Sequence, residues 1–183
     1  MSIVEKAKRH AIKAHKDVNH KYDIHDYDYH LEMAVNFGYM FIHLIPEEDR
    51  ADVIAAIWHH DTIEDCGLTF NNLRDLTNHR IALLAYACTN EKGKTRAERA
   101  NNRYYRGIRN TKYATFVKLC DRMANMHHSH TTKSRMLEMY KKEHKHFKNK
   151  LEPNFLTKLY FKHIKKEPDY TEMWNYLETI YLN

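Results

Sequence analysis

The chain has 183 residues, a formal charge of +6, and only 4 glycines and 3 prolines. That length suits one domain with its own core, and the shortage of turn residues argues against sandwiches and barrels. No signal segment opens the sequence and no stretch approaches the roughly 20 apolar residues of a membrane span, so we expect a soluble, cytoplasmic protein. The positive charge favours an anionic partner, and a solvated basic surface is the alternative.

Helical patterns follow one another along the chain. Apolar periodicity predicts a first helix over residues 2–16 and a second over about 27–44. Pro46 and the acidic residues after it mark the start of a third helix, which we expect to run on through the segment IAAIWHHDTIED. Further helices are predicted over about residues 70–76, 78–88, 95–108, 112–128, 131–149, 153–166 and 169–182. We therefore expect an all-α fold, a single compact bundle of about eight to ten helices over residues 1–183.

The third helix carries a concentration of charge. His60 and Glu64 are four residues apart, as are Asp61 and Asp65, so each pair should stack on one side of the helix. Two carboxylates at this spacing, such as Asp61 and Asp65, weaken an isolated helix by about 0.2–0.5 kcal/mol, and a cation would relieve their repulsion. The apolar residues AAIW before the motif indicate a buried helix, where an unpaired charge is costly. An exposed acidic turn is the alternative.

Two distant residues complete a candidate metal site. His30 opens a largely apolar helix, and Asp121 follows the segment FVKLC. Both could therefore project from buried helices toward His60 and Asp61. Two imidazoles and two carboxylates form a ligand set that suits Mn, Fe, Co or Zn, and the sequence does not choose among these metals.

The order H…HD…D resembles the HD-domain metal-dependent phosphohydrolases. The segment AHKDVNHKYDIHDYDYH is similar to the AHxGQxRKxGxPYxxHP opening of the hydrolase domain in alarmone synthetase-hydrolases and small alarmone hydrolases. HHDTIEDCGLTFNNL resembles the HDxxEDT…T…L block of that branch, and ATFVKLCDRMANMHHS resembles its VxLKLADRLHNMRT segment. The motif-bearing core covers about residues 7–130, and residues 131–183 add only helical similarity.

The resemblance implies a set of roles. One metal ion, in this family normally Mn²⁺, would be held by His30, His60, Asp61 and Asp121. Glu64 and Asp65 would position and deprotonate the attacking water. The implied reaction is hydrolysis of the 3′-pyrophosphate of (p)ppGpp-like nucleotides. The residues implied in substrate contact are His20, Lys21, Asn101, Arg103, Arg122 and Asn125.

The chain also departs from the family pattern. His20-Lys21 stands where the family has an Arg-Lys pair whose arginine packs on guanine, and a histidine lacks the fixed charge and forked donors of arginine. Leu31 replaces the proline that follows the first metal histidine, and one extra residue lies between His15 and His30. These changes predict a reshaped nucleotide pocket around an intact catalytic set.

Four arginines, Arg96, Arg99, Arg103 and Arg106, are spaced 3, 4 and 3 residues apart. On one continuous helix they would form a stripe that binds phosphate, or a solvated basic face. The stripe keeps a second substrate open, a pyrophosphorylated tRNA 3′ end, with the chain acting as the antitoxin of an alarmone-synthetase-like toxin. Other nucleotides such as dNTPs or NADPH, and a non-catalytic nucleotide-binding role, are further alternatives.

Overall fold

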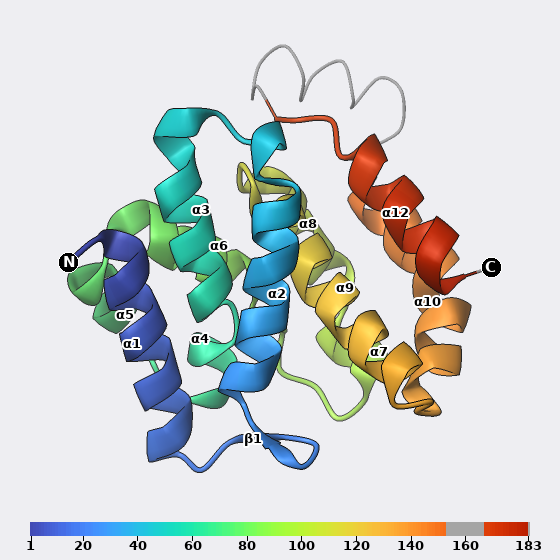
Figure 1. The fold of residues 1–183 in the computed structure, drawn as a ribbon, viewed down its shortest axis with the longest axis horizontal. Helices are drawn as coiled ribbons and strands as arrows, with labels where there is room; N and C mark the ends of the chain where they lie inside the picture. Colours follow the sequence, from blue (N-terminus) through green and yellow to red (C-terminus); the bar gives the residue numbers. More distant parts are fainter. Residues whose placement is uncertain (153–166, 183) are drawn as a thin grey trace.

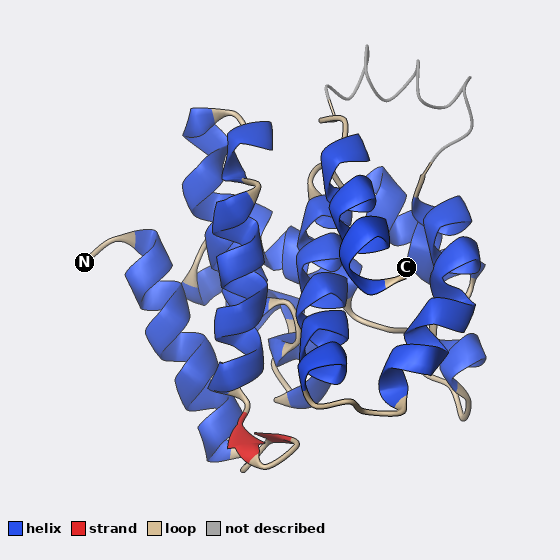
Figure 2. Ribbon diagram, turned by 45° about the vertical axis from the view of Figure 1, so that its right-hand side comes forward, coloured by secondary structure: helices blue, strands red, loops and turns tan. Residues whose placement is uncertain are grey.

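The computed structural model describes residues 1–152 and 167–182, and it is an all-α domain (Figure 2). Within those residues the strands are confined to one short hairpin, in which β1 (Lys21–Tyr22) pairs with β2 (His25–Asp26). No helix in the described part of the chain is long and apolar enough to cross a membrane. The predicted all-α class is confirmed, whereas the predicted helix over residues 153–166 lies outside the described residues.

Most of the predicted helices are present with boundaries shifted by a few residues. In chain order the helical elements are α1 (Ile3–Asp17), α2 (Asp28–Met40), the 3₁₀ helix η1 (Ile42–Leu44), α3 (Glu47–His59), α4 (Thr62–Asp65), α5 (Phe70–Leu76), α6 (His79–Cys88), α7 (Arg96–Arg99), α8 (Asn102–Asn110), α9 (Ala114–Thr131), α10 (Met136–Leu151) and α12 (Thr171–Tyr181).

Side-chain caps fix several helix starts. The hydroxyl of Ser2 accepts a hydrogen bond from the backbone N–H of Glu5 and so caps α1. Thr69 caps α5 in a capping box with Asn72. Asn78 caps α6 by accepting from the N–H of Ile81. The helices therefore begin where short polar side chains can satisfy backbone groups that have no partner within the helix.

Three helices form the centre of the domain. Helix α2 packs against both α3 and α9, with α1 and α6 against α3 and with α10 and α12 against α9 (Figure 1). Gly38 permits the close approach of α2 to α3, because a Cβ at this position would lie 2.5 Å from Cδ1 of Ile57. This packing matters for function, since α2, α9 and the end of α3 carry the predicted metal ligands.

The third helix is shorter than predicted. It ends at His59, the chain turns at His60 and Asp61, and a separate four-residue helix, α4, follows. The hydroxyl of Thr62 donates to the carbonyl of His59 at 2.9 Å, which satisfies an acceptor at the end of α3. The prediction of one helix through the whole motif was wrong. The turn separates His60, which points into the core, from Glu64 on α4.

The predicted helix over residues 95–108 is also interrupted. Helix α7 ends at Arg99, and Asn101 has an extended backbone (φ −84°, ψ −178°) and caps α8 by accepting from two backbone N–H groups. The four arginines therefore lie on two separate helices. The predicted single arginine stripe was wrong, because a second N-cap within six residues of the first at Thr95 ends the helical periodicity.

Two other boundaries differ from the prediction. The second helix ends at Met40 and continues only as the 3₁₀ helix η1, and the helix predicted from residue 131 begins at Met136.

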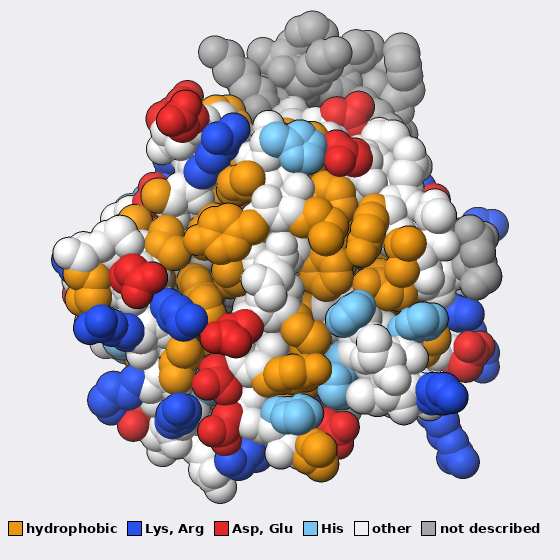
Figure 3. Space-filling model, viewed as in Figure 1, with side chains coloured by type: hydrophobic (Ala, Val, Ile, Leu, Met, Phe, Trp, Pro, Cys, Tyr) orange, Lys and Arg blue, Asp and Glu red, His pale blue; other side chains and the backbone are white. Residues whose placement is uncertain are grey.

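Apolar side chains cover much of one face over α2, α3 and α12 (Figure 3). The large exposed side chains on these elements include Tyr39, Met40 and Ile180, and none of the three lines the cavity described below.

Candidate metal centre

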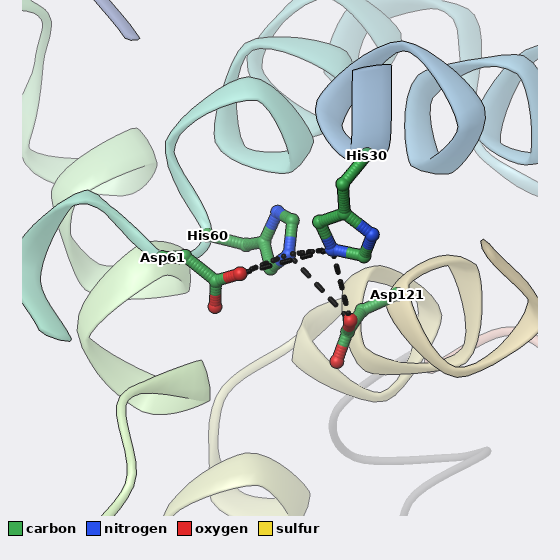
Figure 4. A group of neighbouring side chains, drawn as sticks. All are labelled: His30, His60, Asp61 and Asp121. Carbon is green, nitrogen blue, oxygen red and sulfur yellow. Dashed lines mark hydrogen bonds and ion pairs between the residues drawn. The ribbon is translucent and has the colours of Figure 1, made fainter. Parts of the chain in front are cut away.

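Four side chains predicted as metal ligands meet in the interior of the domain (Figure 4). His30 comes from the first turn of α2, His60 and Asp61 from the turn after α3, and Asp121 from the middle of α9. His30 and His60 are fully buried, and Asp121 is 7% exposed. Packing of α2, α3 and α9 therefore brings together residues that lie up to 91 positions apart in the sequence.

The separations of the ligand atoms fit a shared cation. Nε2 of His60 lies 3.2 Å from Nε2 of His30 and 2.9 Å from Oδ2 of Asp61. Oδ1 of Asp121 lies 3.3 Å from Nε2 of His30 and 3.6 Å from Nε2 of His60. Ligands at about 2.1 Å from one ion are about 3.0–3.4 Å apart in octahedral or tetrahedral geometry. The four residues could therefore hold one metal ion.

The backbone orients one of the two imidazoles. Nδ1 of His60 donates a hydrogen bond to the carbonyl oxygen of Ile57 at 2.7 Å, so its Nε2 carries the lone pair that a metal needs. Nδ1 of His30 is buried and has no hydrogen-bond partner among the described residues. The protein thus fixes the ring nitrogen that His60 presents, and the position of His30 follows from its place in α2.

The cluster concentrates charge in a buried space. Burial disfavours the charged forms, but Lys118 and both histidines hold the pKa of Asp121 well below its ordinary value. Burial likewise opposes ionisation of Asp61, yet His60 lowers the pKa of this carboxyl. In return Asp61 and Asp121 raise the pKa of His60 well above its ordinary value, against the effect of burial. Lys118 supplies one positive charge to this pair of carboxylates, so the second must come from a proton on imidazole or from a metal ion.

Neighbouring polar side chains hold the carboxylates. The hydroxyl of Tyr27 donates to Oδ2 of Asp61. The amide of Asn125 donates to Oδ1 of Asp121 at 2.6 Å and in turn accepts from the hydroxyl of Tyr22 at 2.9 Å. The sequence analysis did not assign these roles to Tyr22 or Tyr27. Orientation of ligands by such outer contacts is typical of metal sites in proteins.

The two predicted catalytic carboxylates lie beside the cluster in different environments. Glu64 accepts hydrogen bonds from the backbone N–H and the side-chain amide of Asn90, both at 3.0 Å. The side chain of Asp65 is 33% exposed, and partial burial together with the negative charges of Asp61 and Glu64 raises its pKa to about 7. Asn90 was missed by the sequence analysis, because its contact with Glu64 spans 26 residues. Glu64 is therefore fixed, and Asp65 is suited to exchange a proton near neutral pH.

A cavity of about 930 Å³ opens next to these residues. Its floor includes Asp61, Glu64, Asp65 and Asp121, and its walls come from α7, α8, α9 and α10. The volume lies at the upper end of the range for small-molecule sites. Helix α10, for which the sequence suggested no role, thus forms one wall of the cavity.

The residues predicted to contact substrate fall into two groups. Asn101, Arg122 and Asn125 line the cavity. His20, Lys21 and Arg103 are not among the described residues that line it. The geometry therefore brings only half of this predicted set to the cavity.

The three predicted residues outside the cavity lining each contact other side chains. The ring of His20 stacks on Tyr27 with centroids 3.9 Å apart, and its Nδ1 lies 3.9 Å from Oδ2 of Asp65. Lys21 pairs with Asp26 on the neighbouring strand. Arg103 pairs with Glu91 at 3.3 Å. His20 therefore lies beside Tyr27 and Asp65, whereas Lys21 and Arg103 pair with nearby carboxylates.

Arg122 is held in the cavity wall. Its guanidinium lies over the rings of Phe147 and Tyr140, 4.2 and 4.8 Å from their centroids, and 3.4 Å from a carboxylate oxygen of Glu143. Glu143 also receives two hydrogen bonds from Arg96. These contacts join α7 and α9 to α10. Arg122 is thus a buried cation whose charge is partly balanced by Glu143.

Comparison with known proteins returns no match: no protein-family model, no curated protein and no solved structure matches the chain. The interpretation of the site therefore depends on the residues and their geometry.

Proposed function

We propose that the protein is a metal-dependent phosphohydrolase of the HD-domain type, with His30, His60, Asp61 and Asp121 as the ligands of one ion. The single observation that carries the proposal is the convergence of these four residues, three of them buried and Asp61 partly buried, at the floor of a large cavity. The adjacent carboxylates Glu64 and Asp65 add the groups that hydrolysis requires.

The proposed chemistry divides between the ion and the chain. A divalent ion, when bound, polarises a phosphoryl oxygen and makes water more acidic. Asp65 accepts a proton from the attacking water, because its raised pKa matches that task near neutral pH. Glu64, held by Asn90, orients the water. Mn²⁺ is the proposed ion, since the mixed imidazole and carboxylate set suits it and the motifs resemble those of manganese enzymes.

The proposed substrate is a (p)ppGpp-like nucleotide, which would lose pyrophosphate from its 3′ position. Two features support a nucleotide: the cavity volume of about 930 Å³, and the cations Arg96, Arg122 and Lys118 in its lining. The resemblance of the three motif segments to small alarmone hydrolases supports the 3′-pyrophosphate as the group removed.

A second candidate is removal of pyrophosphate from a modified tRNA 3′ end, as in an antitoxin. It is favoured by Arg99 and Lys142, exposed cavity-lining cations for which no carboxylate partner occurs among the described residues. Such side chains can contact a phosphodiester backbone without reading its sequence.

A turnover panel tests the proposal. Purified protein with Mn²⁺ is incubated with ppGpp, pppGpp, ppApp, dNTPs, NADPH and pyrophosphorylated tRNA, and released phosphate and pyrophosphate are measured. We expect metal-dependent release from at least one substrate, and none with Asp121→Asn. Absence of turnover across the panel with metal bound would refute the proposal. Turnover of tRNA alone, reduced by Arg99→Glu and Lys142→Glu, would favour the second candidate.

A further inference from the structure

Lys118 flanks the candidate metal centre on the side of the cavity. It lies one helical turn before Asp121 on α9, and its Nζ is 2.8 Å from Oδ2 of Asp121. The other oxygen of that carboxylate, Oδ1, is the one that faces His30 and His60. One carboxylate therefore lies between the ammonium group and the space that the ligand atoms surround.

The surroundings of Lys118 leave part of its hydrogen-bonding capacity unused. Its side chain is 13% exposed and lines the cavity. An ammonium has three N–H donors, and Asp121 is the only carboxylate within ion-pair distance of Nζ among the described residues. The ring of Tyr104 lies beneath the ammonium, with its centroid 5.7 Å from Nζ, and supports the lysine from the cavity wall.

Burying an ammonium with one carboxylate partner stays costly until hydrogen bonds also satisfy its remaining N–H donors. Neutralising Asp121 does not by itself require Lys118, because a cation among the four ligands would do the same. A phosphoryl group placed at the centre would bring its oxygens next to Asp121, within reach of the donors that Lys118 has free. Charge-assisted hydrogen bonds to phosphate are among the strongest that a side chain makes.

We propose that Lys118 is a phosphate-binding catalytic residue of the centre, donating to a non-bridging oxygen of the phosphoryl group under attack, with Tyr104 as the residue that positions it. The inference depends on the proposed function, since it assigns a contact within the same site. Lys118 would stabilise the negative charge that develops on the phosphoryl oxygens during attack. The role of Lys118 could not be predicted from the sequence pattern.

The test measures phosphate binding apart from turnover. Inorganic pyrophosphate is titrated calorimetrically into protein saturated with Mn²⁺, after the Mn²⁺ affinity of each variant has been determined. Lys118→Met should weaken pyrophosphate binding about 10-fold or more, the effect of a lost hydrogen bond to a charged group. The matched control is Lys145→Met, which removes the same charge from an exposed position of α10 outside the cavity lining and should change the affinity less than about 3-fold.

Equal losses in the two variants would mean that only the net charge of the protein matters, and unchanged affinity in Lys118→Met would mean that the lysine only neutralises Asp121. Either result overturns the inference. It would also be overturned if the metal-loaded wild-type protein did not bind pyrophosphate. A protein that binds pyrophosphate through Lys118 but turns over no substrate would instead contradict the proposed function.

A second measurement does not depend on the folding of Lys118→Met. Protein labelled with ¹⁵N-lysine and loaded with diamagnetic Zn²⁺ is observed by NMR before and after addition of pyrophosphate. The Nζ resonance of Lys118, assigned by its loss in Lys118→Arg, should shift and exchange more slowly with water. An unchanged Lys118 resonance at saturating pyrophosphate would overturn the inference.

Discussion

The Nε2 atoms of His30 and His60 lie 3.2 Å apart inside the domain, and a carboxylate oxygen lies within 3.7 Å of each. Two imidazole nitrogens lie this close when one carries a proton that it donates to the other, or when both bind the same metal ion. Because the pKa of His60 is raised well above its ordinary value by the two carboxylates, the cluster without metal holds a proton. Metal binding should displace that proton.

Metal should stabilise the folded protein. At a free Mn²⁺ concentration about 100-fold above Kd, binding adds about 2.7 kcal/mol, which corresponds to an increase in Tm of about 5–10 °C. His30→Gln should abolish the increase, whereas the control His79→Gln, on the exposed start of α6, should retain it. Thermal unfolding with Mn²⁺ and with EDTA provides the measurement. A full metal-dependent increase in His30→Gln would show that this residue is not a ligand.

Loss of the proton acceptor should stop catalysis without loss of the ion. Asp65→Asn should lower kcat by about 10²–10⁴-fold, the usual contribution of a general base, while Mn²⁺ affinity changes little. The exposed Asp75→Asn is the matched control. Initial rates and metal titrations on the same preparations check both expectations. Asp65→Asn with wild-type activity would exclude Asp65 as the base.

The pH profile of the wild-type enzyme should have an acidic limb from Asp65. Partial burial and the charges of Asp61 and Glu64 raise its pKa to about 7 in the absence of metal. A cation among the ligands opposes the charge of Asp61, so in the metal-loaded enzyme kcat/KM should fall at a pH below 7 as Asp65 takes up a proton. A profile that is flat from pH 4 to 8 would contradict this assignment.

Asn90 should position Glu64. Asn90→Ala removes the side-chain hydrogen bond to Glu64 but keeps the backbone N–H, so we expect a loss in kcat of about 5-fold, equivalent to about 1 kcal/mol. Metal affinity and Tm should stay near the wild-type values. Asn149→Ala, an exposed position on α10, is the control. A kcat equal to that of the wild type would mean that the backbone contact alone holds Glu64.

Asp49 should make stability depend on pH. Burial raises its pKa, but hydrogen bonds from Tyr113 and Arg80 and the charge of Lys112 outweigh burial and lower the pKa below its ordinary value of 3.8. A lowered folded-state pKa stabilises the fold above the unfolded-state pKa, and this contribution is lost as the pH falls.

Asp49→Asn should therefore reduce the free energy of unfolding by about 1–3 kcal/mol at pH 7. The difference in unfolding free energy between the variant and the wild type should shrink below about pH 4, because the wild-type carboxyl takes up a proton and loses its charge. Urea unfolding at several pH values measures it. A difference that is constant from pH 3 to 7 would contradict the assignment.

The sequence alone predicted the elements with strong local signals. The helical class follows from periodicity, and His30, His60, Asp61 and Asp121 were predicted from short motifs that lie next to apolar segments. The interruptions were harder to predict. Asn101 has the residue type of an N-cap, but its position inside an otherwise helical pattern concealed that role.

Contacts between distant segments could not be predicted from local pattern. Asn90 lies in a polar loop, and only the packed fold shows that it reaches Glu64. Arg122 was expected at the substrate, whereas α10, to which the sequence assigned no role, supplies Glu143 and Phe147 to hold it. Such pairings depend on how helices far apart in the chain pack together, which periodicity does not report.

Every proposed role in the site requires that four side chains hold one metal ion. A crystal of the protein grown with Mn²⁺ and measured with X-rays at the manganese absorption edge would show the ion in the anomalous difference map. We expect one strong peak bounded by His30, His60, Asp61 and Asp121. A map without a peak there, or with manganese bound only elsewhere, would contradict it.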